Sequence, residues 1–136
     1  MRVKKKIANS TARRIHGIDR PNGAPIFLTG FQETMLVFLL LNGPSNTATI
    51  ANKCRTTGNE KTRKRETLRY LQYMKNCHLM TSYERPFHDG GYIWYVSPIG
   101  EEVACHLLED PDARIGIQLD FRRGKTHRFC PTIKSG

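Results

Sequence analysis

The sequence predicts an α+β domain with a basic arm at each end, and three observations support this prediction. Apolar residues recur at the three- and four-residue spacing of helices in several segments, whereas Tyr92–Val96 has the aromatic and β-branched composition of a strand. A chain of 136 residues is long enough for one domain with a buried core. The formal net charge of +10 is unevenly distributed along the chain.

Basic residues are concentrated at the two ends. Residues 1–25 contain seven Lys or Arg and one acid, and residues 121–136 contain five and no acid. Residues 26–120 contain 10 basic and 11 acidic residues, so we expect a nearly neutral domain between two cationic arms. Such arms attract polyanions, of which nucleic acid is the most common, through salt-sensitive and sequence-independent contacts. The arm cations expected to act in this way are Lys4, Lys5, Lys6, Arg13, Arg14, Arg122, Arg123 and Lys125.

The first elements of the domain are predicted from residues 26–44. Ile26–Leu28 has the composition of a short strand. Thr29 is an expected helix N-cap, and Gln32 three residues later completes a capping-box pattern. The following helix, Gly30–Asn42, is apolar nearly all round and ends at a Gly-Pro pair. A helix of this composition belongs in a core or in a subunit interface.

Two further helices are expected, at Thr47–Arg55 and at Glu60–Met74. The second is amphipathic, and the residues that share its apolar face are Thr67, Tyr70, Leu71 and Met74. The cations of its other faces are concentrated in its first half and include Lys61, Lys64, Arg65 and Arg69. Such a helix can be anchored at one end while its other end faces phosphates or base edges. The alternative is an ordinary solvated surface helix.

The remaining pattern alternates between strands and helices. Leu79–Glu84 and Tyr92–Val96 are predicted strands joined by a loop that contains Pro86 and two glycines. Glu101–Leu108 is a predicted helix with its apolar residues on one side. Strict alternation of apolar residues over Ile115–Phe121 indicates a last strand.

This order of elements resembles the winged helix-turn-helix family over about Phe31–Leu108. Thr47–Cys54 and Thr67–Met74 resemble the two helices of the motif, and Leu79–Val96 resembles the wing. Ser97–Glu102 is similar to the Ser/Thr-x-x-Gly step that starts the next helix in many bacterial and archaeal regulators of this class. The resemblance implies a three-helix core with a two-stranded β wing.

Two features depart from the family pattern. The turn around Thr56–Arg63 is several residues longer than the usual tight turn, which leaves the start of the recognition helix open. His78 stands where many members of the family carry glycine.

The resemblance implies a sequence-specific regulator that binds double-stranded DNA, with Glu60–Met74 in the major groove. The residues then expected to contact DNA are Lys61, Thr62, Arg63, Lys64, Arg65 and Arg69 in the helix, with Arg85 and His88 at the wing tip. Two alternatives stay open at this point. Arg63 or Arg65 could pair with Glu60 or Glu66 along the helix, and Arg85 could be an ordinary solvated turn residue.

Two other classes of function fit the same pattern. A winged-helix protein associated with RNA or the ribosome would also carry basic arms, and an adaptor on a polymerase or replication complex would use the wing or the apolar helix. The aromatic residues of Tyr92–Val96 suggest a stacking platform for single-stranded nucleic acid. We instead expect Trp94 to pack against the helices, because one side of such a strand faces the core.

Catalytic and metal sites are not expected. The two Cys-His pairs, Cys77-His78 and Cys105-His106, lack the short Cys-x-x-Cys spacing of structural zinc sites, and adjacent residues point in different directions. We therefore predict buried thiols, no enzyme activity and no cofactor.

The sequence also bears on location and oligomeric state. No apolar run is long enough to span a membrane and no signal peptide is recognisable, so we expect a cytoplasmic protein. We predict a homodimer, with the helix Gly30–Asn42 or the strand Ile115–Phe121 at its interface. Either element could instead complete the core of the monomer, the strand by pairing with Ile26–Leu28.

Overall fold

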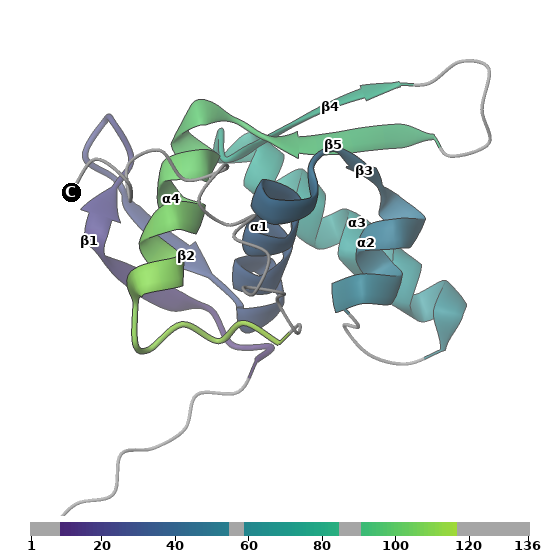
Figure 1. Cartoon of the computed structure of the whole chain (residues 1–136), viewed down its shortest axis with the longest axis horizontal. Helices are drawn as coiled ribbons and strands as arrows, with labels where there is room; N and C mark the ends of the chain where they lie inside the picture. Colours follow the sequence, from purple (N-terminus) through teal and green to yellow (C-terminus); the bar gives the residue numbers. More distant parts are fainter. Residues whose placement is uncertain (1–8, 55–58, 85–90, 117–136) are drawn as a thin grey trace, which may run out of the picture.

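The computed structural model describes residues 9–54, 59–84 and 91–116, and Figure 1 shows how their helices and strands are arranged. The elements in chain order are β1 (Arg13–Asp19), β2 (Pro25–Leu28), α1 (Gly30–Asn42), β3 (Ser45–Asn46), α2 (Thr47–Cys54), α3 (Glu60–Asn76), β4 (Met80–Glu84), β5 (Tyr92–Val96) and α4 (Pro98–Glu109). Helix α1 lies in the middle, with β1, β2 and α4 at one end of the molecule (left in Figure 1) and α2 at the other.

The strands form two antiparallel sheets. β1 pairs with β2 in a hairpin, and a second sheet has the order β3-β5-β4. In the second sheet Ser45 lies opposite Trp94, and Glu84 lies opposite Tyr92. Three helices followed by a β4–β5 hairpin, with a short strand between the first two helices closing the sheet, is the winged helix-turn-helix arrangement. The predicted fold is therefore confirmed.

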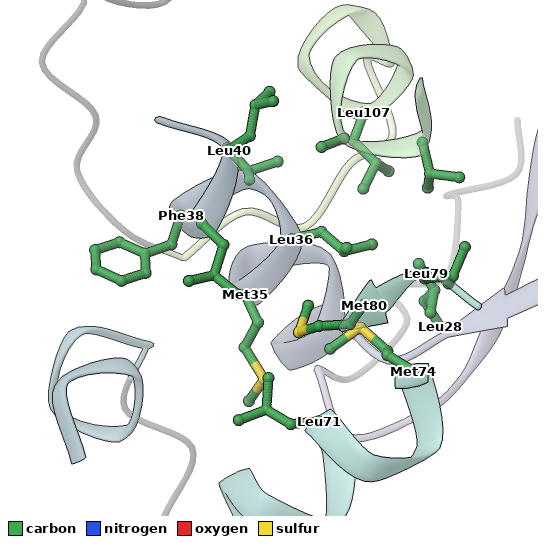
Figure 2. Close-up of a cluster of buried hydrophobic side chains, with 14 of the residues drawn as sticks. Leu28, Met35, Leu36, Phe38, Leu40, Leu71, Met74, Leu79, Met80 and Leu107 are labelled. Carbon is green, nitrogen blue, oxygen red and sulfur yellow. The ribbon is translucent and has the colours of Figure 1, made fainter. Parts of the chain in front are cut away.

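Helix α1 forms the centre of the hydrophobic core. Its residues from Met35 to Leu40 are all buried. Figure 2 shows Leu71 of α3 against Met35, and Met74 of the same helix against Met80 at the start of β4. Of the two roles left open for this apolar helix, completing the core of the monomer is the one that the structure supports.

The capping box predicted before α1 is present. The Thr29 hydroxyl accepts a hydrogen bond from the backbone N–H of Gln32 at 3.1 Å, and the Gln32 side chain accepts one from the N–H of Thr29 at 2.9 Å. Two N–H groups that the helix itself cannot satisfy are thus paired inside the protein. The bounds of α1 coincide with the predicted bounds.

The junction between α3 and β4 has a backbone conformation that favours glycine, although His78 stands there. His78 has a φ of +65°, in the left-handed region that glycine adopts at least cost. The N–H of Leu79 donates to the carbonyl of Met74, and the N–H of His78 donates to that of Lys75. These two bonds form a Schellman motif, which ends α3 and turns the chain into the wing.

Helix α4 begins at Pro98, three residues before the predicted start. Ser97 is its N-cap, accepting from the N–H of Gly100 at 3.0 Å, and proline at the first position of a helix gives up no hydrogen bond. A Cβ atom added to Gly100 would lie 1.8 Å from the carbonyl oxygen of Leu79. The Ser-x-x-Gly step therefore lets the start of α4 approach the backbone at the base of the wing.

The N-terminal region differs from the predicted arm. Arg13–Asp19 forms β1, with Ile15 fully buried and Ile18 packed on the core, so this segment belongs to the domain. Because Ile15 and Ile18 are three residues apart and the strand pairing is irregular between Arg14 and Asp19, the sequence shows no two-residue alternation there. β2 confirms the strand expected at Ile26–Leu28, but its partner is β1. Ile115 and Gly116 are not in a strand, and the rest of Ile115–Phe121 lies outside the described residues.

Candidate nucleic-acid interface

Helix α3 is the first part of the candidate interface. Its N-cap is Asn59, whose side chain accepts from the N–H of Thr62 at 2.9 Å. The helix is anchored by Thr67, Leu71 and Met74, which are completely buried. Because these three residues lie from the middle of the helix onward, the first two turns extend away from the core, toward the right of Figure 1.

The exposed face of α3 is cationic. Lys61, Arg65 and Arg69 are exposed and follow one another at four-residue spacing, so they form a row along the outer side of the helix. Lys64 is exposed beside this row, whereas Thr62 and Arg63 are half-buried. The exposed cations are thus the predicted residues best placed to reach a ligand outside the protein.

The wing lies beside α3. The Lys75 ammonium near the end of α3 donates to the Ser82 hydroxyl of β4 at 3.0 Å, and β4 and β5 extend toward the same end of the molecule as the start of α3. The two predicted wing-tip residues, Arg85 and His88, lie outside the described residues.

Trp94 connects the wing to α2. It is 2% exposed, and its indole N–H donates to the Thr47 hydroxyl at 2.9 Å. The prediction that Trp94 packs in the core is therefore confirmed. Tyr92 and Tyr95 of the same strand are partly exposed, and the ring of Tyr95 lies 6.0 Å from that of Tyr83. The hydrogen bond from Trp94 to Thr47 holds the first residue of α2 against β5. The start of the helix-turn-helix is therefore fixed relative to the wing.

A buried ionic cluster lies at the start of α1, and the sequence pattern did not reveal it. The Glu33 carboxylate is 0% exposed and accepts hydrogen bonds from the guanidinium groups of Arg13 and Arg114, the shortest at 2.9 and 2.8 Å. Arg13 also donates to Asp110 at 3.0 Å. These four residues, Arg13, Glu33, Asp110 and Arg114, are called the ionic clasp below.

The clasp shifts the pKa values of Arg13 and Asp110. Hydrogen bonding to Glu33 raises the pKa of Arg13, with a smaller contribution from Asp110. Burial acts to raise the pKa of Asp110, but hydrogen bonds from the Asp112 backbone and from Arg13 outweigh it, so that the pKa lies below its ordinary value. Both shifts favour the charged forms of Arg13 and Asp110.

The predicted arm cations occupy different environments. Arg13 is held in the clasp, which is a correction to its assignment as an arm residue available to a polyanion. Arg14 is exposed on β1, and its guanidinium lies 3.4 Å from the carboxylate of Asp19. The other six lie outside the described residues: Lys4, Lys5, Lys6, Arg122, Arg123 and Lys125.

The cysteines of the described part form no disulfide bond. Cys54 and Cys105 are buried, Cys77 is half-buried, and burial raises the pKa of Cys54 to about 12. Within residues 9–54, 59–84 and 91–116, no group of three or more His, Cys, Asp or Glu side chains is placed to hold a metal ion. No helix in these ranges has the length and apolar character needed to cross a membrane.

No protein-family model matches the sequence, and no curated protein matches it. Among solved structures, the chain is similar to ZitR of Lactococcus lactis, a zinc-responsive MarR family member, with a TM-score of 0.49 and 16% identity over 88% of this chain and 66% of that one. A mutant of ZitR gives a TM-score of 0.47 at 18% identity, covering 81% and 60% of the two chains. The complex of ZitR with DNA gives 0.44 at 23% identity, covering 62% and 56%. In the match to the ZitR mutant the chain thus spans only 60% of its neighbour's length.

Proposed function

We propose that this protein binds double-stranded DNA and regulates transcription, with α3 as its recognition helix. The observation that carries the proposal is the exposed row of Lys61, Arg65 and Arg69 on a helix whose second half is anchored in the core. An α-helix fits the major groove of B-DNA, where each base pair has its own pattern of donors and acceptors.

The roles of the α3 cations follow from their positions. In helix-turn-helix proteins the first residues of the recognition helix contact base edges. Lys61 and Arg65 lie in the first two turns, so we assign them to bases, with Lys64 beside them. Arg69 lies one turn further along, and we assign it to a phosphate.

The test is fluorescence anisotropy with a duplex enriched from a randomised pool. An arginine bidentate to guanine discriminates against the wrong base by about 1–3 kcal/mol, so Arg65→Ala should reduce the preference for the enriched site by about 5- to 150-fold. Lys53→Ala is the matched control, because it removes an exposed lysine from the last turn of α2 and leaves α3 and its contact with the wing unchanged. Loss of site preference in the control, or none in Arg65→Ala, would contradict the assignment.

The same titration with structured RNA tests the alternative class. We expect the DNA duplex to be bound more tightly than the RNA. The exposed face of α3 can enter the wide major groove of B-DNA, whereas the major groove of A-form RNA is too narrow for side chains to read. Equal or tighter binding of RNA would favour an RNA- or ribosome-associated protein instead.

We also propose that the protein acts as a homodimer, because two recognition helices are needed to match the two half-sites of a palindromic operator. α1 is buried in the monomer, so it does not supply the dimer contact. Analytical ultracentrifugation should give twice the 15.6 kDa mass of the chain, and a monomer at micromolar concentration would rule out this part of the proposal.

A further inference from the structure

The Gln32 side chain, in the first turn of α1, is hydrogen-bonded at both ends of its amide group. Its carbonyl oxygen accepts from the N–H of Thr29 in the capping box, and its NH2 group donates to the backbone carbonyl of Tyr70 in α3 at 3.2 Å. The side chain is only 3% exposed. Beside it, the Phe31 ring lies 5.9 Å from the Tyr70 ring. Gln32 is thus a polar bridge from α1 to the proposed recognition helix.

The residues that anchor α3 in the core supply no comparable directional contact. Leu71 and Met74 have apolar side chains, and the completely buried Thr67 hydroxyl has no hydrogen-bond partner among the described residues. Apolar packing is non-directional, so it allows a helix to slide or tilt slightly. An N–H···O bond, in contrast, spans only about 2.7–3.2 Å and weakens steeply when it is bent. The bond to Tyr70 therefore restricts how α3 can slide or tilt on α1.

The first turn of α1, from which the bridge starts, is itself held by several contacts. The Glu33 carboxylate is bound in the ionic clasp. The N–H of Gly30 donates to the carbonyl of Asn9, the first described residue, at 2.8 Å. The N–H of Gly116, the last described residue, donates to the Thr34 hydroxyl at 2.9 Å. A bridge can position α3 only if its own base is fixed, and these contacts meet that condition.

The cations assigned to bases lie far from the bridge. Lys61 and Arg65 precede Tyr70 by nine and five residues, which corresponds to about 14 Å and about 8 Å along a helix axis. A tilt of about 5° at Tyr70 would thus move Lys61 by about 1 Å. A displacement of this size breaks a hydrogen bond to a base edge, whereas the Coulomb attraction to a phosphate changes little.

From this geometry we propose that Gln32 is a positioning residue for sequence readout, because its bond to Tyr70 sets the position of α3 and so the preference of the protein for its site. The inference rests on the proposed function, in which Lys61 and Arg65 contact bases. Gln32 is buried and does not reach DNA itself. Its loss should therefore reduce the preference for the enriched site without changing the number of phosphates that the protein neutralises.

The test compares two substitutions in the same capping box. Gln32→Met keeps the length of the side chain and removes its bond to Tyr70, whereas Thr29→Val removes the hydroxyl that caps the N–H of Gln32 and leaves the bond to Tyr70 in place. Anisotropy with the enriched duplex and a random duplex, at several salt concentrations, gives the site preference and the salt slope. Gln32→Met should lower the preference at least about 5-fold, the loss of one base contact, at an unchanged salt slope. Thr29→Val should keep the preference of the parent.

A second measurement needs no DNA. Spin labels attached to p-acetylphenylalanine at Asn22, which is exposed in the turn between β1 and β2, and at Lys61 report the distance from that turn to the start of α3 by pulsed electron paramagnetic resonance. The distance distribution should be broader in Gln32→Met than in the parent, and unchanged in Thr29→Val. If Gln32→Met does not fold, Gln32→Glu takes its place, because a carboxylate still accepts from the N–H of Thr29 and has no N–H to donate to Tyr70.

The outcomes for Gln32 and for the proposed function are distinguishable. The inference is overturned if the Gln32 variant keeps the site preference or the distance distribution of the parent, or if Thr29→Val changes them equally. A parent without any duplex preference, or an Arg65→Ala variant that keeps its preference, contradicts the proposed function instead. In that case the distance distribution still decides whether Gln32 positions α3.

Discussion

Helix α1 is held differently at its two sides. Toward α3 it is held by apolar side chains, of which Leu71 and Met74 are completely buried. Toward β1 and the segment after α4 it is held by the ionic clasp, whose Arg13 and Arg114 side chains are only 10% and 12% exposed. Apolar contacts are non-directional and tolerate repacking, whereas buried charges depend on every partner. The side that contacts α3 should therefore tolerate substitution better than the side that contacts β1 and the segment after α4.

The largest expected effect is on the clasp. Glu33→Ala leaves two buried guanidinium groups without their shared carboxylate, which should lower the free energy of unfolding by about 4 kcal/mol. Urea denaturation followed by circular dichroism gives this value. Arg14→Ala, which breaks the exposed pair with Asp19, is the control and should change stability by less than about 1 kcal/mol. A loss below 1 kcal/mol in Glu33→Ala would show that the clasp is not a stabilising contact.

Next in size is the apolar side. Leu71→Ala removes a side chain that is 0% exposed, and we expect a loss of about 3 kcal/mol in the same urea titration. Leu71→Met nearly conserves the volume and should cost less than about 1.5 kcal/mol. If Leu71→Met lowered the free energy of unfolding as much as Leu71→Ala, the apolar side of α1 would tolerate substitution no better than the clasp.

A smaller effect is the pH dependence of stability, which we expect from the ionic clasp and not from the apolar side of α1. The pKa of Asp110 is lower in the folded protein than its ordinary 3.8, so its ionised form stabilises the fold above that pH, and this contribution is lost as the pH falls through the folded pKa. Asp110→Asn should therefore cost about 1 kcal/mol at pH 7, and the difference from the parent should shrink below pH 4. Thermal unfolding at a series of pH values measures it. A difference independent of pH would mean that the carboxylate charge is not involved.

The smallest expected effect is a gain. His78 has a φ of +65°, a conformation that costs a non-glycine residue on the order of 1–2 kcal/mol. Glycine removes this cost, but it also increases the entropy of the unfolded chain, which offsets part of the gain in stability. His78→Gly should therefore stabilise the protein by about 1 kcal/mol, or about 2–4 °C in Tm by calorimetry. His78→Ala, which keeps the strain, should give no such gain.

The two sides also differ in how far the sequence predicts them. The bounds of α1, its capping box and the apolar face of α3 follow from periodicity and from neighbours three or four residues apart, and these predictions hold. The clasp joins Glu33 to Arg114, 81 residues away, and Arg13 to Asp110, 97 residues away. No local pattern marks such pairs, because each member alone resembles a solvated charge.

Two strands were also missed, each for its own reason. β3 has only two residues, Ser45 and Asn46, which is too short for any alternation to be visible. In β1, Ile15 and Ile18 are three residues apart, so the sequence shows no two-residue alternation there. In the candidate interface, the exposure of Lys61, Lys64, Arg65 and Arg69 follows from the helical pattern, while the partial burial of Thr62 and Arg63 depends on packing against the rest of the fold.

The attachment of Asn9 and Gly116 to one turn of α1 has a consequence for protein engineering. Because the described part of the chain begins and ends at neighbouring points on its surface, a short linker could join those points, and new termini could be opened in the exposed turn at Asn22-Gly23. Such a circular permutant would keep the contacts of the core and of α3. It would also leave out residues 1–8 and 117–136, which carry +8 of the formal net charge of +10, so that the domain could be studied without its basic ends.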